Sequence, residues 1–255
     1  MTSAFPPDTG LPATVLASPN FDARKAPADM LLLHYTGMPT AEEARARLVD
    51  PASKVSCHYL VDEDGSVVQM VPEAQRAWHA GLASWEDETD INSLSIGIEI
   101  VNPGHEHGYR AFPEKQIAAV IALARDICAR NAIPSERVLG HSDVAPRRKE
   151  DPGELFPWER LAGYGLGIWV PPAPLDTEGF SFSEGDRGEP VEELQSRLAL
   201  LGYGVEISGL FDSGTRSVVA AFQRHYRPAR IDGTADPSTV ETLGQLLAAL
   251  PVRAG

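Results

Sequence analysis

A proline- and glycine-rich stretch constrains the fold more than any other feature, because it divides the chain into two unlike parts. Residues 164–183 hold three glycines and three prolines without a repeating period, a composition that is typical of a linker. Before this stretch, short apolar runs alternate with helical patterns, whereas after it the pattern is helical alone. We therefore predict a larger domain over residues 1–165, a linker over 166–183 and a small domain over 184–255.

The larger domain has the sequence pattern of an α/β fold. Short apolar runs predict strands at 31–35, 56–61, 66–71, 95–100 and 137–139. The Asp-Glu-Asp-Gly sequence at 62–65 predicts a hairpin turn between the second and third of them. Helices are predicted at 41–49, about 112–131 and 156–161, while residues 1–30 are expected to have little regular structure. This alternation indicates a mixed central sheet flanked by helices.

The small domain is predicted to be all-α. Apolar residues recur at helical spacing after Pro190, after Asp212 and after Pro237, which gives three short helices. Asp236 is the predicted N-cap of the third helix, with Pro237 at its first position. Three short helices bury only a small core, so we expect this domain to be marginally stable by itself.

One loop of the larger domain, residues 139–153, combines an imidazole, several cations and a carboxylate among prolines and glycines. A catalytic zinc ion needs three protein ligands and one open position for water. His141 and Asp151 on this loop supply two ligands. His34, at the end of the predicted strand 31–35, is the best candidate for the third. These residues predict a zinc hydrolase.

Hydrolysis of an amide also needs a base for the attacking water and a charge that stabilises the oxyanion. Glu99, the one glutamate in the apolar strand 95–100, is the predicted base, and Lys149 is the predicted oxyanion stabiliser. Structural alternatives remain for two of these residues: His34 as a core histidine and Glu99 as a solvent-facing strand residue.

Four further residues are candidates for substrate contact: His58, Trp78, His79 and Arg147. For His58 a structural role is an equal alternative, and the basic run that contains Arg147 is in many proteins a solvated face. Asp143 follows His141 by two residues, and we expect it to hold the loop or to accept a hydrogen bond that orients His141.

Composition excludes two kinds of partner. The net charge of −14 argues against nucleic acid, because phosphate binding needs clustered lysine and arginine. The sequence also holds no apolar run of the roughly 18 to 20 residues that a membrane span requires. Cys57 and Cys128 are expected to be buried, reduced thiols rather than a disulfide or a zinc site.

Five separated motifs stand in order along the larger domain: Leu32–Thr36, Ser56–Val61, Ala77–Gly81, Asn92–Glu99 and Gly140–Pro146. Together they resemble the zinc-dependent N-acetylmuramoyl-L-alanine amidases, whose fold is shared with the peptidoglycan recognition proteins. The resemblance covers about residues 30–161, and residues 147–158 are most similar to the broad-specificity bacterial branch.

This resemblance implies a site and a reaction. Zinc would be bound by His34, His141 and Asp151, with Glu99 and Lys149 as catalytic partners. The enzyme would cut the amide between the lactyl group of N-acetylmuramic acid and L-alanine. Some members use cysteine as the third ligand, but here the position holds Asp151, so no thiolate ligand is expected.

The small domain resembles a second family, the peptidoglycan-binding three-helix module, over about residues 184–248. The matching segments are Gly185–Gly188, Val191–Gln195, Leu201–Tyr203, Gly209–Asp212, Ala221–Gln223 and Ile231–Asp236. The sequence Asp212-Ser213-Gly214 departs from the Gly-Pro that the module usually has before Thr215. The resemblance implies peptidoglycan or muropeptides as the partner.

Two rival functions remain open at this point: a non-catalytic binder of peptidoglycan fragments, and a zinc hydrolase that acts on another amide. The presence of the ligand set together with Glu99 and Lys149 favours the amidase. Residues 1–8 lack the basic region and apolar core of a secretory signal. We therefore expect a cytoplasmic protein, with the periplasm as the alternative because a wall-binding module would meet polymer there.

Overall fold

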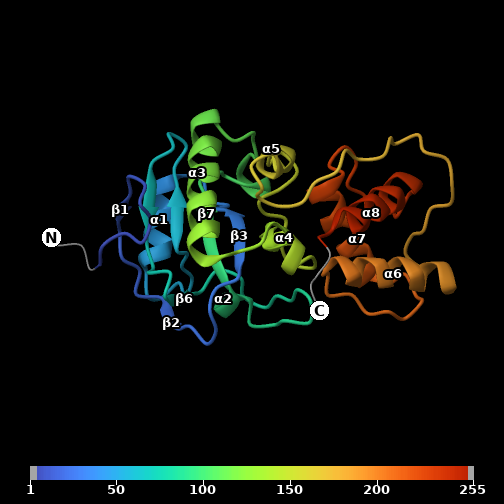
Figure 1. Cartoon of the computed structure of the whole chain (residues 1–255), viewed down its shortest axis with the longest axis horizontal. Coiled ribbons are helices and arrows are strands. Elements are labelled where there is room, and N and C mark those ends of the chain that lie inside the picture. Colours follow the sequence, from blue (N-terminus) through green and yellow to red (C-terminus); the bar gives the residue numbers. More distant parts are fainter. Residues whose placement is uncertain (1–4, 252–255) are drawn as a thin grey trace.

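The computed structural model describes residues 5–251, so the outer ends of the two predicted domains, residues 1–4 and 252–255, lie outside the described residues. Its centre is a six-stranded mixed sheet (Figure 1). In spatial order the strands are β1 (Thr14–Val15), β5 (Val67–Gln69), β4 (Tyr59–Val61), β7 (Ser95–Ile100), β3 (Met30–Tyr35) and β8 (Val138–Gly140). Neighbouring strands from β4 to β8 are parallel, and β5 is antiparallel to β4. The predicted α/β class with a mixed sheet is confirmed.

Two helices cover opposite faces of this sheet because its side chains alternate in direction. Helix α3 (Glu114–Asn131) packs the apolar stripe that contains Val120 and Ala124 against Leu33 and Ile98. Helix α1 (Ala41–Val49) packs on the other face, where Leu48 meets Leu60. Figure 1 shows α3 in front of the strands.

Local chemistry sets the ends of these elements as predicted. The Thr40 hydroxyl accepts a hydrogen bond from Glu43 N at 3.1 Å and caps α1. Between β4 and β5, Gly65 has φ +89°, and an added Cβ there would lie 2.8 Å from the Lys115 carbonyl oxygen. Only glycine tolerates both conditions, which explains the hairpin at 62–65.

The expectation for residues 1–30 is wrong in part. Strand β1 pairs with β5, and β2 (Phe21–Ala23) pairs with β6 (Gln75–Ala77) in a second, two-stranded sheet. Strands β1, β2 and β6 are each only two or three residues long, and β2 is exposed throughout. Strands this short leave no alternating pattern in the sequence.

Short helices complete the amidase-like part of the chain. They are α2 (Ile91–Leu94), the 3₁₀ helices η1 (His105–His107) and η2 (Ser135–Arg137), α4 (His141–Val144) and α5 (Trp158–Ala162). Beyond them lie the three predicted C-terminal helices, α6 (Glu189–Leu201), α7 (Ser213–Tyr226) and α8 (Pro237–Ala249). As predicted, the Asp236 side chain caps α8 by accepting from Thr239 N at 2.7 Å.

The C-terminal helices share a hydrophobic cluster with the sheet. Leu32 and Leu139 belong to the same cluster of buried residues as Phe222 and Tyr226. The first part of the segment predicted as a linker joins this packing, since Ile168, Trp169 and Val170 pack against the same cluster. Figure 1 shows α4 between the sheet and α7. The domain boundaries at 165 and 184 stay predictions.

Within residues 5–251, none of the helices is long and apolar enough to cross a membrane. The cytoplasmic location stays a prediction. Both cysteines are free: Cys57 is buried beside Met70, and Cys128 lies half-buried on α3.

Candidate metal centre

Strand register brings the candidate ligands together. In the parallel pair β3 and β7, His34 lies directly beside Glu99, so both side chains point to the same face. On the other side of β3, Leu33 lies beside Gly140, the last residue of β8, and His141 follows immediately. The carboxyl ends of adjacent parallel strands are where ligands bind in open α/β sheets.

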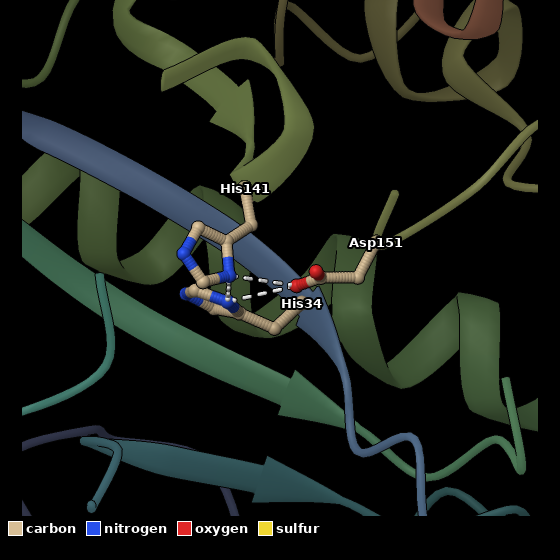
Figure 2. A group of neighbouring side chains, drawn as sticks. All are labelled: His34, His141 and Asp151. Carbon is tan, nitrogen blue, oxygen red and sulfur yellow. Dashed lines mark hydrogen bonds and ion pairs between the residues drawn. The ribbon is translucent and has the colours of Figure 1, made fainter. Parts of the chain in front are cut away.

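The three predicted ligands converge on one point, as Figure 2 shows. His34 Nδ1 lies 2.9 Å from His141 Nδ1 and 3.1 Å from Asp151 Oδ2. The third edge, from His141 Nδ1 to Asp151 Oδ2, measures 3.0 Å. All three residues are buried. The structure thus brings together residues that are more than 100 positions apart in the sequence.

The spacing of these atoms fits a small divalent ion. In a tetrahedral site with bonds of about 2.0–2.1 Å, neighbouring ligand atoms lie about 3.3 Å apart. The observed triangle is a few tenths of an ångström tighter, which a small outward shift of each side chain corrects. Two imidazoles and one carboxylate are also the donor set of several catalytic zinc sites.

Hydrogen bonds on the outer side fix the orientation of His141. Its Nε2 lies 2.9 Å from the carbonyl oxygen of Ala80, which can only accept. In a ring that carries one proton, that proton would sit on Nε2, and Nδ1 would present a lone pair to the carboxylate of Asp151. Two lone pairs 3.0 Å apart would repel each other unless a cation lay between them.

His34 is oriented by a longer chain of hydrogen bonds. The Ser95 hydroxyl donates to the Ile91 carbonyl oxygen at 2.6 Å, so its oxygen can accept from His79 Nε2 at 3.3 Å. His79 Nδ1 is then left with a lone pair, which accepts from His34 Nε2 at 3.0 Å. Each link follows from the one before it, because a carbonyl only accepts and a neutral imidazole carries one proton. The chain leaves the lone pair of His34 on Nδ1, facing the ligand cluster.

Burial and neighbouring charges keep the ligands in the state that a metal requires. Burial, together with His141, lowers the pKa of His34 to about 4, so this ring is neutral at pH 7. Burial by itself would raise the pKa of Asp151, but the adjacent His141 and His34 outweigh it and hold that pKa well below its usual range. The site therefore presents the neutral ring of His34 and the ionised carboxylate of Asp151.

Glu99 and Lys149 face the pocket next to the three ligands. Both line a hollow with Trp78, His79 and the ligands His141 and Asp151. Oε2 of Glu99 is buried and has no hydrogen-bond partner among the described residues. Burial raises the pKa of Glu99 well above its usual value, Asp151 raises it further, and Lys149 opposes both. A buried, unpaired carboxylate atom in a pocket is poised to take up a proton.

The structure separates the four substrate candidates. Trp78 and His79 line the pocket, and the Trp78 indole N–H donates to Asp22 Oδ2 at 2.8 Å. His79 is 9% exposed and lies behind His34, so its main contact is with a predicted ligand.

His58 does not reach the pocket. It is fully buried, its Nδ1 accepts from Gly97 N at 2.9 Å, and its Nε2 lies 3.0 Å from the Gln75 carbonyl oxygen. Burial, reinforced by the charge of Arg24, lowers the pKa of His58 to about 3. The structural alternative is the one that this geometry supports.

Arg147 is also outside the pocket, and its neighbour takes the predicted place. Arg147 is exposed and lies against Gly214 at the start of α7, where an added Cβ would be 2.0 Å from the guanidinium. Arg148 instead lines a second hollow, which it shares with Lys149 and His141. Its guanidinium donates to the Ala80 carbonyl oxygen at 3.0 Å, beside the His141 contact. Adjacent basic residues look alike in a sequence, and only the loop conformation decides which one faces inward.

Asp143 holds the loop as predicted but does not contact His141 through its side chain. Its Oδ2 accepts from Gly140 N at 2.8 Å. The same carboxylate also accepts from the Tyr203 hydroxyl and from His225 Nδ1, both in the C-terminal helical region. The sequence carries no signal for these two partners, since they lie 60 and 82 residues away.

Comparison with known proteins identifies the families that the two parts of the chain match. Residues 24–154 match the family of N-acetylmuramoyl-L-alanine amidases, and residues 187–243 match the peptidoglycan binding domain family. The N-acetylmuramoyl-L-alanine amidase AmiD of Escherichia coli (strain K12) is 37% identical over 225 residues, which cover 82% of this chain and 79% of AmiD.

Two solved structures have the same fold over most of their length. The complex of E. coli AmiD with the substrate anhydro-N-acetylmuramic acid-L-Ala-D-γ-Glu-L-Lys has a TM-score of 0.74 at 35% identity, covering 89% of this chain and 92% of that one. AMPDH3 of Pseudomonas aeruginosa in complex with anhydromuramic pentapeptide has a TM-score of 0.71 at 28% identity, covering 88% and 93%. From the family match and the likeness to AmiD, we conclude that the chain belongs to the N-acetylmuramoyl-L-alanine amidases and carries a peptidoglycan binding domain in its C-terminal part.

Proposed function

We propose that this amidase depends on zinc and hydrolyses the amide between N-acetylmuramic acid, or its anhydro form, and L-alanine in wall turnover and recycling. The observation that carries the zinc assignment is the convergence of His34 Nδ1, His141 Nδ1 and Asp151 Oδ2, which lie 2.9 to 3.1 Å from one another. The substrate class is supported by AmiD and AMPDH3, whose structures hold anhydromuramic peptides.

The ligand set suits hydrolysis. Zinc in such a site supplies Lewis acidity, which acidifies water to a pKa of about 7 and polarises a carbonyl group. Metal ligation requires neutral imidazoles, so with Asp151 as the one charged ligand a divalent ion held there would keep a net positive charge. The fourth side of the site faces the pocket that Glu99 and Lys149 line, where water and the scissile amide have room.

Glu99 is the proposed general base and acid. It lies beside His34 across the β3–β7 ladder, so its carboxylate is fixed by strand pairing rather than by a loop. It takes the proton from the attacking water and passes it to the leaving amine of L-alanine. Burial and the charge of Asp151 raise its pKa well above the ordinary value, which favours uptake of a proton, and the charge of Lys149 opposes both.

Lys149 is the proposed oxyanion stabiliser. It lies on the loop between His141 and Asp151. It lines three hollows, and each of them is also lined by at least one of these two ligands. Its ammonium group donates to the carbonyl oxygen as negative charge develops there. Trp78 forms one wall of the same pocket and is the proposed contact for substrate.

The test is release of the stem peptide from an anhydro-muropeptide, followed by chromatography. We expect chelation to abolish release and added zinc to restore it. Glu99→Gln keeps the shape and the metal but should lower kcat by about 10²–10⁴-fold. Zinc content measured on the same sample is the control. Full activity after chelation would contradict the zinc assignment, and binding without release in zinc-replete protein would favour the rival, non-catalytic function.

A further inference from the structure

The loop that carries two of the proposed ligands is held from outside the amidase region. We propose that the C-terminal helical region positions the metal centre, through Tyr203 and His225, which both hydrogen bond the carboxylate of Asp143. The inference rests on the proposed function, because it concerns the same ligands. It assigns to the C-terminal helices a second role, distinct from binding peptidoglycan.

The contacts of Asp143 carry the proposal. Its side chain is completely buried on α4, two residues after His141. Oδ1 accepts from the Tyr203 hydroxyl at 2.8 Å, while Oδ2 accepts from His225 Nδ1 at 2.7 Å and from Gly140 N at 2.8 Å. Two of its three hydrogen bonds therefore come from the C-terminal region. A buried carboxylate that loses such partners is strongly destabilised.

This carboxylate links the C-terminal region to the ligand loop. The hydrogen bond from Gly140 N to Asp143 closes the first turn of α4, and His141 is one of the two residues between them. The backbone N–H of Ser142 in turn donates to the Asp151 carbonyl oxygen at 2.9 Å, which ties the two ends of the loop together. A shift of Asp143 would thus move both ligands relative to His34.

The ring of His225 is held in a fixed direction. It stacks on Trp158 with ring centroids 3.8 Å apart and on Tyr226 at the same distance, nearly parallel to both. Two parallel rings at this separation must lie on opposite faces of His225. Because a carboxylate only accepts, the Nδ1 proton of His225 points at Asp143. The stack belongs to both regions, since Trp158 is on α5 and Tyr226 is on α7.

Helix α7 touches the same loop at two further points. Arg224 donates to Glu150 Oε1 at 3.2 Å, next to the ligand Asp151. The Arg147 guanidinium lies over Gly214, a position where any side chain would collide with it. Contacts at residues 143, 147 and 150 span the loop between the two ligands. We therefore expect α7 to act on the whole loop rather than on one residue.

A matched pair of substitutions separates positioning from packing. His225→Phe keeps the aromatic stack and removes the donor, whereas His225→Asn keeps a donor at the place of Nδ1 and removes the stack. If the hydrogen bond to Asp143 positions the loop, His225→Phe should weaken zinc affinity by about 10-fold, as supports outside a ligand set do, and lower kcat more than it raises KM. His225→Asn should lose less zinc affinity and less kcat than His225→Phe. A role in packing alone predicts the opposite order.

Zinc affinity is measured on the full chain by competition with a chromophoric chelator. Tyr203→Phe, which removes one hydroxyl, should change it in the same direction as His225→Phe. Arg197→Gln is the control, because Arg197 lies half-buried on α6, away from the ligand loop, and its guanidinium pairs with Glu193. If the effect passes through Asp143, the double variant Asp143→Ala/His225→Phe should bind zinc no more weakly than Asp143→Ala.

Amide hydrogen exchange over residues 141–151 gives a readout that needs no metal. His225→Phe should speed exchange of this loop in the metal-free protein, while Arg197→Gln should leave it unchanged. Unchanged exchange and unchanged zinc affinity in a folded His225→Phe variant would overturn the positioning role. A wild-type protein that binds no zinc would overturn the proposed function instead, and the exchange result would still decide the role of α7.

Discussion

The two sides of the metal centre are built differently. His34 lies on β3, between β7 and β8, and its orientation depends on the buried pair His79 and Ser95. His141 and Asp151 flank a loop whose buried carboxylate, Asp143, has most of its partners in the C-terminal region. One side is held by backbone ladders with the neighbouring strands β7 and β8, and the other by two side chains of the C-terminal region, Tyr203 and His225.

This difference shows that a ligand can belong to one part of the chain and be held in place by another part. A strand fixes a side chain through a ladder of backbone hydrogen bonds, and substitutions elsewhere disturb it little. A loop has no such ladder, so its geometry depends on each contact that ties it down. The proposed zinc site therefore needs both parts of the chain, although all three ligands belong to the first.

Removal of a ligand should have the largest effect on zinc binding and activity. The effect should be equal for His34 on the strand side and Asp151 on the loop side. His34→Ala and Asp151→Ala each leave two protein ligands, so both should lose bound zinc and lose more activity than the roughly 10–100-fold that changes outside the ligand set cause. Metal analysis and peptide release on the two variants check this. If one variant kept zinc and activity, that residue would not be a ligand.

Removal of a side chain that orients His34 should weaken zinc binding less than removal of a ligand does. Ser95→Ala removes the acceptor of His79 Nε2, so the chain that fixes the tautomer of His34 is broken. Zinc affinity should fall by about 10-fold, whereas Ser95→Thr, which keeps the hydroxyl, should retain most of it. The hydrogen exchange of residues 141–151 should not change in either variant. Faster exchange there would show that the two sides are not held independently.

The smallest expected effect is on the stability of the folded protein at low pH, and it concerns His58, behind the strand side of the site. His58 has a pKa of about 3 in the folded protein against an ordinary value near 6.5. Between these values the unfolded chain binds the proton and the folded chain does not, so stability falls as the pH falls, by at most about 1.4 kcal/mol per pH unit.

His58→Gln should therefore flatten the pH dependence of stability below pH 6.5. Urea unfolding of the metal-free protein at several pH values checks this, with the exposed His107→Gln as the control. An unchanged slope in His58→Gln would mean that His58 is not buried as a neutral ring.

Local patterns predicted most of the fold. The Thr40 cap, the hairpin with Gly65 and the strand 95–100 each depend on residues within a few positions of one another, and each is found where it was predicted. The pairs β1–β5 and β2–β6 were missed because such short strands gain their hydrogen bonds from distant partners. Burial of Leu166 and Ala173 within the predicted linker was missed for the same reason, since composition alone says nothing about packing.

The candidate site, like the fold, could be predicted from the sequence only in part. His34, His141 and Asp151 could be predicted because metal chemistry restricts ligands to a few residue types at strand and loop ends. Their supports could not, because the Ala80 carbonyl oxygen is a backbone group with no residue signature. Arg147 was preferred to Arg148 without a basis for the choice, and only the path of the loop distinguishes them.

The most direct test of the central claim is X-ray absorption at the zinc edge on the reconstituted protein. The account predicts four light ligands at about 2.0–2.1 Å, two of them with the scattering pattern of imidazole, and no sulfur. His34→Ala should reduce the imidazole contribution. A sulfur ligand at about 2.3 Å, or a first shell without imidazole, would contradict the assignment of His34, His141 and Asp151.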